Sequence, residues 1–259
     1  IGYWVDLDDP YITYKPKYME TVWWLLKQLY NKGLLYKGYT IQPYSPKAGT
    51  GLSSHELNQP GCYRDVSDTT IVAQFRVKNF APQATKELEN PEGTIYILAW
   101  TTTPWTLPSN VALTVHADAE YVKVKQGESF YYLAEALVSK VLEGEYEIVE
   151  HMKGKDLEYQ EYEQLLPFIE PDKKAFFVTT ADYVTMEDGT GIVHTAPGFG
   201  EDDYNTGVRY GLPVLKPVDG EGKFTETPWK GIFVMDADPM VINYLDERGQ
   251  IYRKQRMEH

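Results

Sequence analysis

The spacing of hydrophobic residues changes along the chain, from a helical repeat near the N-terminus to a strand-like repeat further on. Between Tyr18 and Tyr30, apolar side chains recur at intervals of three and four residues, which predicts one amphipathic helix. Gly33 follows as a suitable end for that helix. Residues 42–51 are so rich in proline and glycine that we expect a loop or a boundary there.

From Thr69 onward, short runs of β-branched and aromatic residues alternate with turn residues, a pattern typical of β-strands. A short helix is expected over Ala134–Leu142, where the apolar spacing favours a helix. These patterns predict an α+β, mainly β domain of barrel or sandwich type. The predicted strands are Ile71–Val77, Thr94–Trp100, Tyr121–Lys125, Phe130–Leu133, Ala175–Thr180 and Gly191–His194.

The last part of the sequence carries helix signals. Asp238 followed by Pro239 is typical of a cap and a first-turn proline, and Gly249 is typical of a stop. We therefore expect the chain to leave the β region through a helix. Both ends of the sequence fall inside predicted structure, so we expect these residues to be a piece of a longer protein.

Composition narrows the class of protein. The 259 residues contain 42% hydrophobic and 24% charged side chains, as in ordinary globular proteins, and no apolar run approaches the ~20 residues of a membrane span. We therefore expect no membrane partner. The net charge of −13 disfavours broad electrostatic binding of nucleic acid. Cys62 is the single cysteine, which excludes an internal disulfide and indicates a reducing, cytoplasmic setting.

A group of hydroxyls follows the strand predicted to end at Trp100. Pro104 forces Thr103 out of helical geometry, so the side chains of residues 101–103 should emerge at a strand end, where a ligand can reach them. The alternative is that these threonines simply favour a strand.

A second stretch, residues 189–204, reads as a buried strand, a glycine- and proline-rich loop and an acidic helix start. It could place the His194 imidazole and a carboxylate on one rim. Asp202 and Asp203 are sequence neighbours, so their side chains diverge and do not form a facing acid/base pair. The alternatives are a structural role for His194 and a capping role for one aspartate.

Other catalytic signatures are missing from the sequence. There is no His-x-x-x-His spacing, no Gly-x-Ser-x-Gly nucleophile motif and no Walker-type phosphate loop. Water is therefore the expected nucleophile if the chain is a hydrolase. A metal-dependent hydrolase that uses Glu201, Asp202 and Asp203 is a competing hypothesis.

Together, the two stretches resemble the paired motifs of the editing domain that interrupts the catalytic fold of isoleucyl-, valyl- and leucyl-tRNA synthetases. Residues 103–108, 194–200 and 61–66 resemble the isoleucyl version, and the resemblance covers nearly the whole chain. It implies a β-barrel-like core with peripheral helices, reached through a helical connecting stem.

The resemblance implies three segments: a connective stem at 1–65, an editing domain at 66–235 and a returning helix toward the catalytic core at 236–259. Ser45 and Ala48 stand where many relatives carry a cysteine pair for zinc, so we expect no metal here. The ATP-binding signatures of the class I core are absent, so we expect no synthetic activity. ATP, magnesium and any zinc would belong to the parent enzyme.

The resemblance also implies roles for individual residues. Asp203 would bind the α-ammonium of a misattached valine, and Thr102 and Thr103 would orient the ester or the attacking water. His194 would form a pocket wall that admits valine and excludes isoleucine. The other expected substrate-binding residues are Thr101 in the pocket, Asn110 on the terminal adenosine, and Trp100 and Trp105, which either stack on the adenine or pack in the core.

A hydrophobic pocket separates isoleucine from valine by only about 1–3 kcal/mol, a limit for which isoleucyl-tRNA synthetase is the standard illustration. The expected activity is therefore post-transfer editing, the hydrolysis of Val-tRNA(Ile). The expected partners are the 3′ end of tRNA(Ile) carrying valine and the remainder of the synthetase chain, in a monomeric protein. The alternative is a catalytically inactive module that docks tRNA.

Overall fold

The computed structural model describes residues 2–78 and 93–258, and the chain divides into two compact units at residues 1–40 and 41–259. The described part of the first unit contains α1 (Pro16–Asn31), which confirms the helix predicted from the apolar spacing. Gly33, with a φ of 70°, adopts the left-handed conformation that ends this helix. No residue of α1 is buried. No described helix has the length and apolar content required to span a lipid bilayer.

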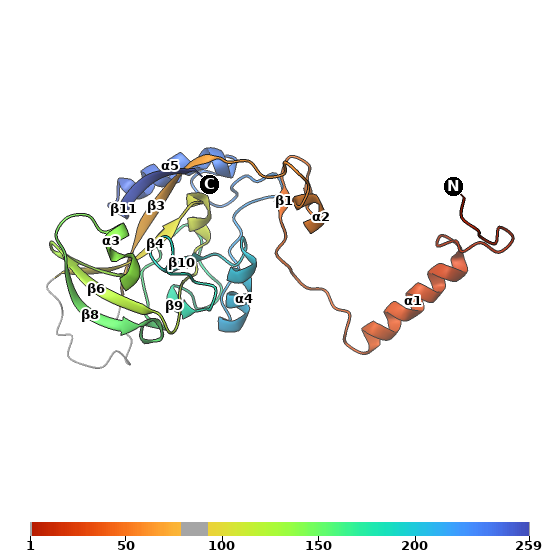
Figure 1. The fold of residues 1–259 in the computed structure, drawn as a ribbon, viewed down its shortest axis with the longest axis horizontal. Helices are drawn as coiled ribbons and strands as arrows, with labels where there is room; N and C mark the ends of the chain where they lie inside the picture. The colour runs from red at the N-terminus through yellow and green to blue at the C-terminus, as the bar shows by residue number, and fades with distance from the viewer. Residues whose placement is uncertain (1, 79–92, 259) are drawn as a thin grey trace. The chain divides into compact units, whose positions relative to one another are not determined.

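The second unit is built on a nine-stranded mixed sheet (Figure 1). Its strands are β3 (Ser67–Arg76), β4 (Thr94–Thr101), β5 (Ala112–Val115), β6 (Glu120–Gln126), β7 (Ser129–Ala134), β8 (Glu147–Lys153), β9 (Phe177–Thr180), β10 (Ile192–Thr195) and β11 (Ile251–Glu258). The helices are α2 (Ser54–Leu57), α3 (Val138–Val141), α4 (Glu201–Tyr210) and α5 (Val234–Asp246), with 3-10 turns η1 (Pro104–Ser109), η2 (Glu135–Leu137) and η3 (Gly154–Leu157). A separate antiparallel pair, β1 (Tyr44–Ser45) and β2 (Thr50–Gly51), lies in the segment predicted as a loop.

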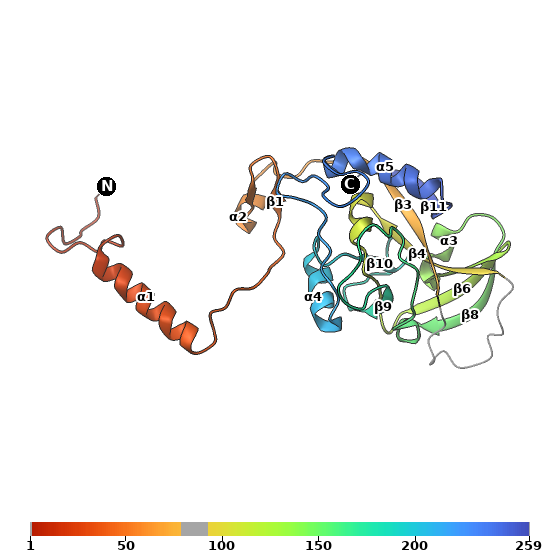
Figure 2. The same ribbon diagram turned by 180° about the vertical axis from the view of Figure 1, so that it is seen from behind.

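Strand β4 connects the two parts of the sheet because it pairs with three neighbours. β3 lies antiparallel along one edge. Along the other edge, β7 pairs with the first half of β4, and β10 takes over at Trp100. The sheet therefore curls into a half-barrel, and α5 lies beside β3 and β11 in both views (Figures 1 and 2). This arrangement confirms the expected α+β, mainly β fold with a barrel-like core.

All six predicted strands are present, and the predicted short helix is present as η2 and α3. The periodicity missed β5, β8 and β11. All four residues of β5 are buried, so this strand shows no alternation of polar and apolar positions. β11 is largely polar and is held by backbone pairing with β3 along Ser67–Ala73.

The end of the chain differs from the prediction. α5 begins at Val234, one turn before the predicted cap at Asp238, and Pro239 lies inside the helix. The capping pattern was misleading because the Asp238 carboxylate accepts a hydrogen bond from Trp105, in a different element. The chain then returns to the sheet as β11, so the prediction of a helix over 236–259 is wrong for its last part. The three segment boundaries stay predictions.

One continuous hydrophobic cluster joins the sheet to α5 and includes Phe75, Leu98 and Leu245. Tyr121 is fully buried in this cluster. Its hydroxyl donates to the Gly191 carbonyl at 2.6 Å and accepts from the His116 N–H at 3.0 Å. Burial raises the pKa of Tyr121 to about 12, so the hydroxyl stays protonated and ties β6 to the start of β10.

Replacing Tyr121 with Phe should lower the free energy of unfolding by about 1–3 kcal/mol, because the Gly191 carbonyl and the His116 amide would lose a buried partner. Chemical denaturation followed by circular dichroism measures the change. Tyr146→Phe is the matched control, since Tyr146 is 39% exposed. Equal losses in the two variants would contradict the assignment.

Candidate active site

A cavity of about 270 Å³ opens where β4 and β10 end side by side. The two strands are parallel and Val193 lies opposite Trp100, so the residues that follow both strands meet at one edge of the sheet. The cavity is lined by Trp100, Thr101, Thr102, Thr103, Thr106, Val193, His194, Ala196, Phe199 and Asp203. The structure therefore brings six of the eight predicted site residues together, and leaves Asn110 and Trp105 outside the lining.

The last residue of β4, Thr101, and the five residues that follow it form what we call the threonine loop, residues 101–106. Thr103 has a φ of −127° and a ψ of 71°, which lies outside the helical geometry that a following proline disfavours, and η1 begins at Pro104. The Thr103 N–H donates to the Thr101 hydroxyl at 3.0 Å, and the Thr106 hydroxyl donates to the Thr103 carbonyl at 2.8 Å. These bonds fix the loop locally and set its hydroxyls along the cavity.

His194 forms the wall beside this loop and is only 8% exposed. Its Nδ1 lies 3.2 Å from the Asn110 amide nitrogen, and its Nε2 lies 2.7 Å from the Thr106 hydroxyl. Because an amide nitrogen only donates, Nδ1 accepts, and the ring proton resides on Nε2 and points to Thr106. Burial lowers the pKa of His194 to about 4, so the ring is neutral at pH 7.

Asn110 lies behind His194, outside the cavity lining. The side chain is 3% exposed. Its amide nitrogen also donates to the Ala112 carbonyl at 2.8 Å, and its oxygen accepts from the Tyr162 hydroxyl at 2.7 Å. The amide nitrogen and oxygen of Asn110 are thus bonded within the protein, and its contact with the terminal adenosine stays a prediction. In this arrangement Asn110 fixes the orientation of the His194 ring.

Asp203 lies in the first turn of α4, and its Oδ2 accepts from the Ala196 N–H at 2.9 Å. Burial raises the pKa of Asp203, the Ala196 N–H opposes this rise, and the neighbouring charge of Asp202 adds to it. Gly200 is the N-cap of α4. Asp202 is exposed and lies outside the cavity lining, so the two aspartates diverge as the sequence predicted.

The two tryptophans have different surroundings. Trp105 packs its ring edge-to-face against Phe199, with ring centroids 5.0 Å apart. Trp100 lines the cavity and packs closely over Gly189, where an added Cβ would lie 2.9 Å from the Trp100 ring. Trp105 therefore braces the cavity from outside, which favours the packing alternative for that residue.

Sequence reasoning gave no separate role to three residues of this site: Thr106, Tyr162 and Phe199. Thr106 carried a usable signal, because a turn that starts at Pro104 returns the side chain three residues after Thr103 to the same face. Tyr162 carried none, since it lies 52 positions after Asn110 in the sequence.

The competing metal hypothesis finds no support in the donor geometry. Within residues 2–78 and 93–258, no group of three or more His, Cys, Asp or Glu side chains is placed to hold a metal ion. Glu201, Asp202 and Asp203 thus form no ligand set in this arrangement.

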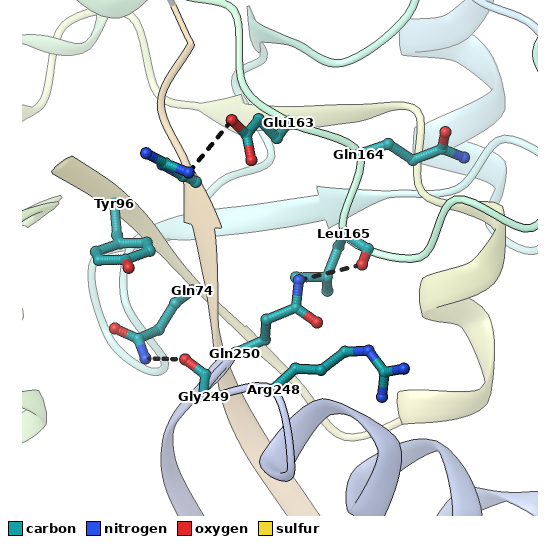
Figure 3. Close-up of a pocket in the computed structure, with 9 residues that line it drawn as sticks. Gln74, Tyr96, Glu163, Gln164, Leu165, Arg248, Gly249 and Gln250 are labelled. Atoms are coloured by element: carbon teal, nitrogen blue, oxygen red, sulfur yellow. Dashed lines mark hydrogen bonds and ion pairs between the residues drawn. The ribbon is translucent and has the colours of Figure 1, made fainter. Parts of the chain in front are cut away.

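A second cavity, of about 220 Å³, lies beside β3 and the end of α5 (Figure 3). Its polar groups bind one another: Arg76 pairs with Glu163 at 3.8 Å, and the Gln74 amide donates to the Gly249 carbonyl at 3.0 Å. It contains none of the eight site residues predicted from the sequence. The cavity at the threonine loop is therefore the candidate active site.

The buried state of His194 predicts an unusual titration. The ring should keep its Nε2–H tautomer down to about pH 5, because protonation would set two donors, Nδ1–H and the Asn110 amide, against each other. Nitrogen-15 NMR of the imidazole measures the tautomer and the pKa, with His151, whose side chain is 59% exposed, as the internal comparison. Protonation of His194 near pH 6.5 would contradict this picture.

The sequence matches a known family over most of its length. Residues 1–188 match the family described as tRNA synthetases class I (I, L, M and V). The whole chain is 52% identical to an isoleucine–tRNA ligase of Clostridium novyi (strain NT), and 86% of it is covered at 53% identity by that of Bacteroides fragilis (strain YCH46). The chain spans only 24% and 21% of these two relatives.

Solved structures share the fold at low sequence identity. GlLeuRS-CP1 superposes with a TM-score of 0.57 at 16% identity, covering 72% of this chain and 99% of that one. The editing domain of the P. knowlesi cytosolic leucyl-tRNA synthetase gives a TM-score of 0.55 at 14% identity, over 73% of this chain and 97% of that one. The chain therefore belongs to the class I tRNA synthetases of the isoleucine, leucine, methionine and valine group, and its β-rich unit has the fold of their editing domain.

Proposed function

We propose that the cavity at the threonine loop hydrolyses Val-tRNA(Ile), releasing valine from a tRNA that should carry isoleucine. The observation that carries this proposal is the meeting of threonine hydroxyls and one half-buried carboxylate in a single small cavity. An aminoacyl ester presents the complementary groups: a cationic amine, a polar carbonyl and a short apolar side chain.

Asp203 binds the α-ammonium group of the misattached valine. Its carboxylate is the only acidic group that lines the described cavity. Burial raises the pKa of Asp203 because it disfavours the charged carboxylate. An incoming ammonium group would offset this cost by forming a charge-assisted hydrogen bond with the carboxylate. Uncharged tRNA lacks the amine and so lacks this contact.

His194 supplies discrimination by size. The ring is neutral, both ring nitrogens are bonded, and the residue is buried, so it makes a rigid wall and is a poor general base. A wall that cannot move rejects the extra methylene of isoleucine by steric overlap. Attraction alone separates the two amino acids by only about 1–3 kcal/mol.

The reaction needs only water as co-reactant. The water oxygen bonds to the ester carbonyl carbon, the ester C–O bond breaks, and the ribose oxygen takes up a proton, giving valine and tRNA(Ile). Thr102 and Thr103 orient the ester and the water, and the adjacent ribose hydroxyl assists. Positioning of this kind can supply several kcal/mol of the required rate acceleration.

This activity fits a chain that spans about a quarter of the related isoleucine–tRNA ligases. We propose that the remainder of such an enzyme, in the cytoplasm, uses ATP and magnesium to charge the tRNA and presents its 3′ end to this cavity. The net charge of −13 agrees with a module that contacts the nucleic acid locally.

Deacylation of Val-tRNA(Ile), measured in single turnovers with excess protein, tests the proposal. Asp203→Ala should slow the reaction by about 10- to 100-fold, the range expected for loss of a charge-assisted hydrogen bond. Asp202→Ala is the matched control, since this neighbouring acid is exposed and lies outside the cavity. Its rate should stay close to that of the unaltered chain, and Ile-tRNA(Ile) should be spared.

Equal rates for the Asp203 variant and the unaltered chain would remove Asp203 from the site. Tight binding of tRNA with no hydrolysis at any protein concentration would identify the inactive docking module instead. Loss of activity in the presence of a chelator would reinstate the metal-dependent alternative.

A further inference from the structure

The start of η1, which follows directly after the three threonines, is held from a distant part of the chain. The Trp105 N–H donates to the Asp238 carboxylate at 2.6 Å, across 133 positions. Thr103, the residue at the N-cap position of η1, makes no capping hydrogen bond with its own side chain. The carboxylate from α5 thus takes the place that a local Ser, Thr or Asp normally fills. The 3-10 turn in yellow lies beside α5 in both ribbon views (Figures 1 and 2).

Trp105 connects the hydrogen bond with Asp238 to the residues of the cavity. Its backbone lies between Thr103 and Thr106, and Thr106 makes the 2.7 Å bond to His194. Its ring packs against Phe199, which lines the cavity from the loop after β10. The indole N–H has no hydrogen-bond partner among the described residues, so the backbone bond to Asp238 is the polar contact that holds Trp105.

Asp238 is costly for stability. Burial raises its pKa to about 7, the Trp105 N–H opposes this rise, and the nearby Asp68 adds to it. An acid whose pKa is higher in the folded chain than in the unfolded chain destabilises the fold as pH rises through that interval. An asparagine could accept the same hydrogen bond without the charge. The contact with Trp105 therefore requires an acceptor oxygen at this position and does not require the charge.

We infer that Asp238 is a positioning residue for the editing reaction, which holds the threonine loop in its reactive arrangement through the Trp105 backbone. This inference rests on the proposed hydrolysis of Val-tRNA(Ile). Asp238 lies outside the cavity lining and touches no substrate; it acts through Trp105, and from there through Thr106 and His194.

Three variants of the chain test the inference. Asp238→Ala removes the acceptor, Asp238→Asn keeps it without the charge, and Asp236→Ala removes an exposed acid from the same helix as a matched control. Two readouts are needed: the single-turnover rate on Val-tRNA(Ile) at saturating and subsaturating protein concentrations, and the hydrogen-exchange rate of the Trp105 amide measured by NMR.

Asp238→Ala should speed exchange of the Trp105 amide and slow the hydrolytic step by about 10- to 100-fold, with little change in apparent substrate affinity, because Asp203 is untouched. Asp238→Asn should restore both the protection and the rate, and Asp236→Ala should match the unaltered chain. Rescue by asparagine would show that the loop requires the acceptor oxygen and not the charge.

An Asp238→Ala form that keeps the full rate, or an Asp238→Asn form as slow as the alanine form, would overturn the inference. Unchanged exchange of the Trp105 amide in Asp238→Ala would overturn it as well. If the unaltered chain hydrolyses nothing, the proposed function fails, while faster amide exchange in Asp238→Ala would still support Asp238 as the anchor of the loop.

Discussion

A single neutral imidazole, buried at the end of β10, organises the cavity on which this account rests. His194 is held in one tautomer because Asn110 can only donate to its Nδ1, and the proton on Nε2 is then directed at Thr106. The chain of bonds continues in one direction from the Tyr162 hydroxyl to the Thr103 carbonyl. Burial keeps the ring uncharged, and a charged ring would break this order at Asn110.

The electrostatic contrast within the cavity follows from the same burial. One wall carries neutral hydroxyls and a neutral ring, and Asp203 is the acidic residue in the lining. A ligand with one cationic end therefore has a single favourable orientation, with its amine at the α4 end. Orientation of this kind is what hydrolysis by a positioned water requires, and it demands no strongly basic residue.

Local sequence patterns predicted much of this architecture. The spacing of apolar residues predicted α1 and six strands. Most residues that meet in the cavity lie at or just after the ends of β4 and β10, two of the strands predicted in this way. Strands β11 and β5 could not be predicted from local sequence. β11 is a strand because it pairs with β3, and β5 is buried on both faces and so lacks an alternating pattern.

The same reason explains what local sequence did not show at the site. Asn110 has the chemistry to bind an adenosine, and its burial beneath His194 depends on Tyr162, which is far away in sequence. Asp238 followed by Pro239 has the local form of a helix cap, yet its carboxylate is directed at Trp105. In both cases the residue type correctly indicated a hydrogen bond, but the bonding partner comes from a distant part of the sequence and is determined by the tertiary fold.

The most direct test of the central claim is a crystal structure of the chain with a non-hydrolysable valyl-adenosine mimic. We expect the amine to lie within hydrogen-bond distance of the Asp203 carboxylate, with the valine side chain against His194 and the scissile carbonyl near Thr102 and Thr103. An amine bound away from Asp203, or an isoleucyl mimic seated equally well in the same cavity, would contradict it.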